Sequence, residues 1–510
     1  MGSAVLTSHW GLDGIIFITV AIVGAYMYMT RKFHYWKNRG VAEISPTPFV
    51  GNFAECLLMK KSPGEFVKDL YDRFSNLPYM GFYVFDRPFF LVRDPELIKN
   101  ILVRDFNYFV DRYASTSPND TLGGANLFLL KNPAWKLARS KTTPILTSGK
   151  LKKMFELMIE VGKDLDNHLE SLDLKGSGTF GRTVEMKELC AKYTTDMIGT
   201  TAYGLKVNSL NNPDAEFRKS GRAMFTFNTW RSMEMTSLFF VPQITKTMGF
   251  DFFTKKTAEF LRQAFWDTIR DRERSGVKRN DFKQLKKKLL RVSEFDGDNL
   301  VAQAAIFFTG GFETASSTMS FAMYELALAP EMQKTLREEI KEGLEQNAGK
   351  ITYDMVMNLP YLNKVVSETL RKYPSLPYLD RAVTADYKVP NSNLVLKKGM
   401  PVFIPMLGLH YDPEYFPNPE VFDPERFSEE NKKGRDPFVY MPFGDGPHFC
   451  IGRRLGLLQT NLGLIYLISN YELSPCKETL IPMKFNSKSF LTAADGGLYL
   501  NVKKMPISVR

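Results

Sequence analysis

One stretch of this chain limits its fold more than any other. From Asp298 to Leu328 the sequence is long for a globular helix and apolar on nearly every side. A helix with that pattern is buried rather than amphipathic. Helical periodicity also dominates the sequence around it, from about residue 130 to residue 375. The sequence therefore predicts a mostly helical body that encloses this helix.

Further elements fit that body. We expect helices in PEMQKTLREEIKEGLEQ (330–346), where Pro330 takes a first-turn position, and in MVMNLPYLNKVVSETLRKY (355–373). Strand patterns occur in YMGFYVFDRPFFLVR (79–93) and GGLYLNV (496–502). Residues 60–505 contain no internal repeat and no linker-like segment. The predicted fold class is mainly α with small β-sheets (α+β), as a single body.

Composition excludes several classes of protein. The chain has 510 residues, 44% of them hydrophobic, which is typical of a packed globular protein and not of a disordered one. Its four cysteines, Cys56, Cys190, Cys450 and Cys476, are too few and too widely spaced for a disulfide framework. No CxxC spacing is present, so a structural zinc site is not expected. The body suits a reducing compartment.

The amino-terminal region is typical of a membrane anchor. Gly14–Thr30 is an uncharged apolar run at the lower length limit for a spanning helix, with Arg31 and Lys32 directly after it. The positive-inside rule then places the following residues in the cytosol. A buried helix of the body is the alternative. We expect an anchor at 1–30, a basic stop-transfer and Pro-rich linker at 31–52, and the body at 53–510.

The net charge of +11 raises the question of nucleic-acid binding. The most basic run, DFKQLKKKLLRV (281–292), reads as an amphipathic helix with a solvated basic face. No recognition motif accompanies it, so we expect no nucleic-acid partner. An anionic membrane surface or an acidic protein partner fits the charge better.

One cysteine stands where chemistry is expected. In PFGDGPHFCIGRRLG (442–456), Cys450 lies between a glycine-containing loop and an apolar, helix-compatible segment. Amides and the positive dipole at a helix start stabilise a thiolate. From this segment alone, Cys450 is a metal ligand, a nucleophile with His448 as its nearest base, or an inert buried cysteine.

The spacing FxxGxxxCxG, here Phe443, Gly446, Cys450 and Gly452, resembles the haem-binding signature of the cytochrome P-450 superfamily of haem-thiolate monooxygenases. The resemblance implies that Cys450 is the axial ligand of a haem b iron and that Gly444 belongs to the same loop. The family has an arginine two residues before the cysteine, where this chain has His448. In the family that arginine pairs with a haem propionate. A histidine can still donate a hydrogen bond there, but its charge depends on pH, so this contact is expected to be weaker.

Three further motifs strengthen the resemblance. Glu368 and Arg371 match ExxR, and Arg426 resembles the third member of the family's structural Glu-Arg-Arg network. GGFET, inside the long apolar helix, matches [AG]Gx[DE]T. There the resemblance implies that Gly310 leaves room for the ligand, that Glu313 relays protons and that Thr314 stabilises the activated oxygen. The alternative for this motif is a helix-packing glycine pair. Trp135 and Arg139 match WxxxR, and with Arg381 they are expected at the propionates.

The implied reaction inserts one atom of O₂ into a lipophilic substrate. The resemblance implies that electrons come from NADPH through a membrane-bound flavoprotein reductase, with a b-type cytochrome as a second donor. It also implies a place in the endoplasmic reticulum membrane, with the body on the cytosolic face. The chain looks most like insect microsomal members of the sixth family, which oxidise xenobiotics and plant toxins. Reductase docking is expected at Lys136, Lys141, Arg453 and Arg454, with a merely solvated basic face as the alternative. By motif offset, the substrate pocket is expected to draw on Phe128, Ile306, Thr309, Leu376, Pro377, Leu379, Leu491 and Thr492.

Two other functions stay open on the sequence. One is a haem-thiolate isomerase or dehydratase that rearranges peroxides without O₂ or a reductase. Such members often lose the acid–threonine pair, which this chain keeps as Glu313 and Thr314. The other is a protein that sequesters ligands without turnover.

Overall fold

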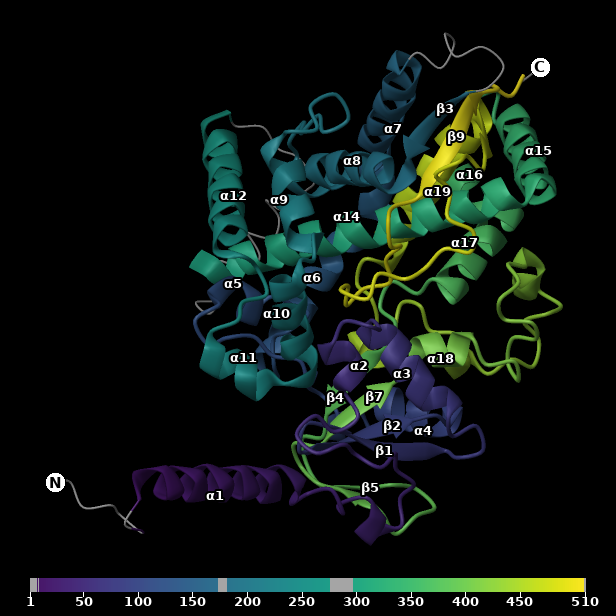
Figure 1. Ribbon diagram of the computed structural model, residues 1–510. Helices are drawn as coiled ribbons and strands as arrows, with labels where there is room; N and C mark the ends of the chain where they lie inside the picture. Colours follow the sequence, from purple (N-terminus) through teal and green to yellow (C-terminus); the bar gives the residue numbers. More distant parts are fainter. Residues whose placement is uncertain (1–6, 8, 173–180, 276–296, 509–510) are drawn as a thin grey trace.

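The computed structural model describes residues 7, 9–172, 181–275 and 297–508. The basic run at 281–292 lies outside the described residues, so its expected helix is not tested. Within the described part, helices predominate and three small sheets lie at the margins (Figure 1). The mainly α class with small sheets is confirmed.

The long apolar stretch forms one unbroken helix, α14 (Gly297–Leu328), buried along most of its length. It crosses the middle of the molecule (Figure 1) and packs against helices from all parts of the chain. Its main partners are α8 (Met186–Ile198), α19 (Arg453–Asn470), α5 (Thr121–Ala125) and α17 (Pro360–Lys372). The central pair of glycines does not break the helix.

The remaining helices complete this body. They are α1 (Trp10–Thr30), α2 (Ala54–Leu57), α3 (Pro63–Asp72), α4 (Pro95–Lys99), α6 (Ala134–Thr142), α7 (Ser148–Ser171), α9 (Glu216–Phe225), α10 (Thr229–Phe240), α11 (Pro242–Met248), α12 (Lys255–Ser275), α15 (Pro330–Gln346), α16 (Tyr353–Asn358) and α18 (Met406–His410). The residues expected to form one helix at 355–373 form parts of α16 and α17 instead. Leu359 separates the two helices because Pro360, at the first position of α17, cannot continue a preceding helix.

Three sheets flank the helices. The largest has the order β1-β2-β7-β4, with β1 (Tyr79–Val84) and β2 (Arg87–Val92) in the segment where strands were expected, joined by β7 (Pro401–Ile404) and β4 (Leu379–Ala382). The second is β3 (Arg182–Glu185), β9 (Tyr499–Lys504) and β8 (Tyr471–Ser474), and the third pairs β5 (Tyr387–Lys388) with β6 (Val395–Leu396). Strand β4 carries Arg381 into the interior, where it is fully buried.

The amino-terminal apolar run forms α1, which is exposed along almost its whole length. Among the described residues it is the one helix long and apolar enough to cross a membrane. The segment after it was expected to be a linker, but it packs on the first sheet. Trp36 is fully buried there beside Phe90, and Arg31 and Lys32 lie 3.0 and 3.2 Å from the carboxylate of Asp86. The body therefore begins before residue 53.

Candidate active site

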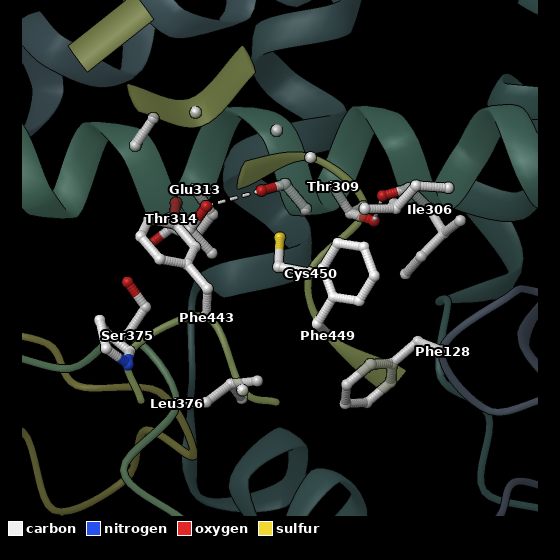
Figure 2. A pocket seen from close by; sticks show the side chains of 18 of the residues that line it. Phe128, Ile306, Thr309, Glu313, Thr314, Ser375, Leu376, Phe443, Phe449 and Cys450 are labelled. Atoms are coloured by element: carbon white, nitrogen blue, oxygen red, sulfur yellow. Dashed lines mark hydrogen bonds between the residues drawn. The ribbon is translucent and has the colours of Figure 1, made fainter. Parts of the chain in front are cut away.

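A cavity of about 300 Å³ separates α14 from the loop that precedes α19. Figure 2 shows Thr309, Glu313 and Thr314 on α14 above Cys450, whose sulfur points toward the helix. The lining is largely apolar, and it joins residues that are more than 300 positions apart in the sequence.

Cys450 lies on the wall opposite α14. Its backbone N–H donates to the Phe443 carbonyl at 2.8 Å, which closes the loop, and α19 begins three residues later. The side chain is exposed to the cavity but otherwise enclosed by protein. Burial raises the pKa of the Cys450 thiol, while the backbone N–H groups of Gly452 and Arg453 and the charge of Arg139 act against that rise. A cation bound at the sulfur would deprotonate it.

The facing side of α14 is open at Gly310. A Cβ atom added there would meet no other atom within 4 Å, whereas at Gly311 it would lie 2.4 Å from Ile198. Gly311 therefore serves helix packing, and Gly310 leaves backbone exposed to the cavity. The Thr314 hydroxyl lines the same wall and donates to the Gly310 carbonyl at 2.7 Å.

Glu313 has a partner that the sequence motifs do not indicate. Lys187, in the first turn of α8, places its ammonium 2.9 Å from Glu313 Oε1 and 2.7 Å from the Ser316 hydroxyl. The Glu313 side chain is mostly buried and that of Lys187 is 27% exposed. This pair thus connects the cavity wall with the protein surface.

One end of the cavity is rich in cations. The side chains of Arg112, Arg139 and Arg381 line it. Burial lowers the pKa of all three guanidinium groups, that of Arg381 to about 9. Asp380 is a nearby carboxylate, with Oδ1 3.5 Å from Arg112 Nη1. Among the described residues, Nε of Arg112 and of Arg381 find no hydrogen-bond acceptor. This end of the cavity is therefore suited to an anionic ligand.

His448 lies at the cationic end, but it acts differently from the expected hydrogen-bond donor to a propionate. Its Nε2 donates to the Val110 carbonyl at 2.8 Å, and its ring contacts Trp135 with centroids 3.9 Å apart and ring planes tilted by 31°. Burial and the charges of Arg381 and Arg112 lower the pKa of His448 to about 2, so the imidazole is neutral. The donor nitrogen is thus already used within the protein, and His448 fastens the cysteine loop to the segment that contains Val110.

Glu368, Arg371 and Arg426 come together, but away from the cavity. Arg371 donates from Nε and Nη2 to the Glu368 carboxylate at 2.7 and 2.8 Å, and Arg426 Nε lies 3.4 Å from Glu368 Oε1. Both Glu368 and Arg371 are fully buried. Arg371 and Arg426 also donate to carbonyls of the chain between His410 and Val421. The trio therefore holds the chain that leads to the cysteine loop.

Most of the site residues expected from the sequence line the cavity. They are Phe128, Trp135, Arg139, Ile306, Thr309, Gly310, Glu313, Thr314, Leu376, Leu379, Arg381, Phe443, Gly444, His448, Cys450, Gly452 and Leu491. Two residues expected in the pocket, Pro377 and Thr492, are not among those that line this cavity. The Pro377 ring packs against Gly64, and the Thr492 hydroxyl donates to the Pro374 carbonyl. Their neighbours Leu376 and Leu491, which were also expected, line the cavity.

Sequence reasoning missed several lining residues. Arg112 carries no family motif, and its role depends on a segment without regular secondary structure. Phe225, Phe252 and Phe490 add an aromatic wall, which a chain with 40 phenylalanines gives no means of singling out. Lys187 could have been found only from the packing of α8 on α14.

The residues present fit a haem. The space beside Gly310 can hold a flat ring, and the Cys450 sulfur lies on the opposite wall. The Nε atoms of Arg112 and Arg381, which have no acceptor among the described residues, could bind carboxylates. The described residues hold no group of three or more His, Cys, Asp or Glu side chains that could bind a bare metal ion. A metal at Cys450 would therefore need ligands beyond those that the described side chains supply, as a porphyrin provides.

Comparison with known proteins agrees with this geometry. A family model described as Cytochrome P450 matches residues 42–500. The chain is 45% identical to Cytochrome P450 6k1 of Blattella germanica, with 98% of each chain covered. It is 43% identical to Probable cytochrome P450 6g2 of Drosophila melanogaster, covering 97% of this chain and 99% of that protein. Cytochrome P450 6j1 of Blattella germanica is 40% identical, over 96% of this chain and 97% of the relative.

Proposed function

The chain belongs to the cytochrome P450 family, and from this premise we propose which residues hold the haem and how they serve the reaction. The protein is a microsomal haem-thiolate monooxygenase that acts on xenobiotics or endogenous compounds and takes its electrons from a redox partner. Haem bound here supplies O₂ activation, in which one oxygen atom enters the substrate and the other is reduced to water.

One observation carries the assignment of the residue that would bind the haem iron. The Cys450 sulfur faces the open backbone at Gly310 across the cavity. We assign Cys450 as the residue that would ligate the iron, and its thiolate would donate electron density to the metal. Arg112, Arg139 and Arg381 would hold the propionates, because buried carboxylates require charged or hydrogen-bonding partners.

Proton delivery is assigned to α14. The Thr314 hydroxyl donates its proton to the Gly310 carbonyl, so the hydroxyl oxygen can accept a hydrogen bond from a proton donor in the cavity. Glu313 lies one residue earlier and is tied to the partly exposed Lys187. We propose that Glu313 transfers protons from the surface side and that Thr314 positions the donor beside the reacting oxygen.

The substrate end is apolar and aromatic. Phe225, Phe252, Phe490 and Leu491 line it. The centre of the Phe128 ring lies 4.3 Å from the guanidinium carbon of Arg112, where this apolar wall meets the cationic end. Such a wall excludes water and takes up a lipophilic molecule, because burial of apolar surface drives binding.

We further propose a location and a redox partner. Helix α1 would anchor the protein in the endoplasmic reticulum membrane, with the body on the cytosolic face. An NADPH-dependent flavoprotein reductase, with a b-type cytochrome as a second donor, would dock over the exposed Lys136, Arg453 and Arg454 and the partly exposed Lys141. Docking of this kind depends on charge, so reduction should slow as the salt concentration rises.

The test of the proposed function is the difference spectrum of the ferrous, carbon-monoxide-bound protein. Wild type should show the strongly red-shifted Soret band of thiolate-ligated haem. Cys450→Ala should lose this band and all NADPH-driven oxidation, while Cys476→Ala should keep both. A Cys450→Ala protein that retains the band would overturn the assignment.

A further inference from the structure

The backbone around Arg112 is held by side chains rather than by regular secondary structure. Residues 111–115 form no helix and only an isolated bridge, between Asp111 and Ala382. The Lys131 ammonium donates to the carbonyl oxygens of Arg112 and of Ala114, the latter at 2.7 Å. Buried carbonyl groups need donors, and here one side chain supplies two of them on either side of Tyr113.

We propose that Lys131 is a positioning residue of the cofactor pocket, which holds the Arg112 backbone so that the guanidinium faces the propionate end of the haem. This inference rests on the proposed function. Lys131 itself does not line the cavity and would act only through Arg112.

The charges around Lys131 support a positional role. Burial, with a smaller contribution from the charge of Arg112, lowers the pKa of Lys131 to about 8, while the nearby carboxylates of Asp380 and Asp111 act against that shift. A cation loses solvation at this place and needs compensating partners. The two carbonyl groups supply the direct hydrogen bonds and the two carboxylates supply the charge; an ammonium has three donors for such contacts, whereas a methionine of the same length has none.

Further hydrogen bonds connect the Arg112 segment with the segments that carry Arg139 and Arg381. Lys131 and Asn132 come just before α6, which carries Arg139, and the Asn132 N–H donates to Asp111 Oδ1 at 2.8 Å. On the other side, Asp380 precedes Arg381 and accepts the Ala114 N–H at 2.8 Å. Movement of the Arg112 segment would thus change the spacing between the cationic side chains at this end of the cavity.

Haem retention tests the proposal in the full-length protein. The rate of haem transfer to excess apomyoglobin is followed at the Soret band for wild type, Lys131→Gln, Arg112→Leu and the double variant. We expect haem loss about tenfold faster in each single variant, which corresponds to about 1.4 kcal/mol. The double variant should lose haem no faster than Arg112→Leu, because Lys131 acts through that side chain.

Controls separate positioning from general stability. Lys131→Arg keeps several donors and should lose haem within twofold of the wild-type rate, and Lys153→Gln, at an exposed lysine of α7, should equal wild type. Lys131→Met fills the same space and replaces Lys131→Gln if the amide prevents folding. A Lys131→Gln rate within twofold of wild type, or a double variant about a hundredfold faster than wild type, would overturn the proposal. A wild type without the red-shifted ferrous band would instead overturn the proposed function.

Discussion

The Lys187 ammonium, on α8, lies 2.9 Å from the carboxylate of Glu313 on the central helix. This ion pair fixes the orientation of the acid that precedes Thr314. It also gives the acid a neighbour that reaches solvent, because Lys187 is partly exposed.

Lys187→Met should therefore impair proton delivery rather than substrate binding. We expect the product formed per NADPH to fall about threefold to tenfold, since a positioned proton donor contributes at least 10²-fold and the acid itself remains. The solvent isotope effect on product formation should rise. Lys192→Met, on the same helix, is the control, and equal coupling in the two variants would contradict this role for Lys187.

Thr314→Ala should uncouple NADPH oxidation from product formation. The hydroxyl is lost from the cavity wall, while α14 keeps its backbone bonds, so haem binding should persist. We expect most of the reducing equivalents to appear as peroxide, measured together with NADPH and product. Thr314→Ser retains the hydroxyl and should restore much of the coupling; failure of serine to do so would point to the methyl group instead.

Glu368→Gln should destabilise the protein without touching the cavity. Removing one charge from a buried pair leaves Arg371 and Arg426 uncompensated, at a cost of about 3–5 kcal/mol. Urea denaturation should show this loss together with poor haem incorporation. Glu345→Gln, at an exposed position of α15, should leave the midpoint nearly unchanged, and similar midpoints for both variants would argue against a buried network.

His410 should make stability depend on pH. It is fully buried, and burial followed by the charge of Arg371 lowers its pKa from 6.5 to about 3. The unfolded chain takes up this proton first as the pH falls through 6.5. The stabilisation present above pH 6.5 is therefore lost progressively toward pH 3, at about 1.4 kcal/mol per pH unit.

Between pH 7 and pH 5, urea denaturation of wild type should therefore lose about 2 kcal/mol more stability than His410→Gln. The comparison is between slopes, so a uniformly less stable variant is still informative. Parallel slopes would contradict this prediction, because they would show that His410 titrates in the folded protein as it does in the unfolded chain.

Two adjacent residues, Leu491 and Thr492, allow ligand binding and structural support to be tested separately. Leu491 lines the cavity, whereas Thr492 donates to the Pro374 carbonyl. In a spectral titration with 4-phenylimidazole, Leu491→Ala should bind about 3–10-fold more weakly, because apolar contact of about 1 kcal/mol is lost. Thr492→Val should bind within twofold of wild type but unfold at lower urea. The reverse pattern would show that Thr492, and not Leu491, contacts the ligand.

Sequence reasoning reached those parts of the fold whose cause is local. The apolar pattern of α14 and the helix signals of α15 predict both elements to within one residue. A motif likewise locates Cys450, Glu313 and Thr314, because their spacing along the chain sets their geometry.

Features that arise from tertiary packing were not accessible in this way. Arg112 and Lys187 face the site only because distant segments fold against them. Pro377 and Thr492, which do not line the cavity, lie in segments without a regular period, where a motif offset cannot tell which of two neighbouring side chains points inward. His448 kept its place beside the cysteine, but its partner Val110 is 338 residues away.

The seat of Trp36 on the first sheet bears on how a soluble form of this enzyme should be made. Deleting residues 1–30 would remove the apolar helix and keep Trp36. Deleting residues 1–52 would also remove Trp36, which covers Gly81 and Phe90. The shorter protein would present a bare aromatic face to water, and such a face favours self-association. A soluble form should therefore begin at residue 31, so that it keeps the 31–52 segment that the sequence alone suggests is only a linker.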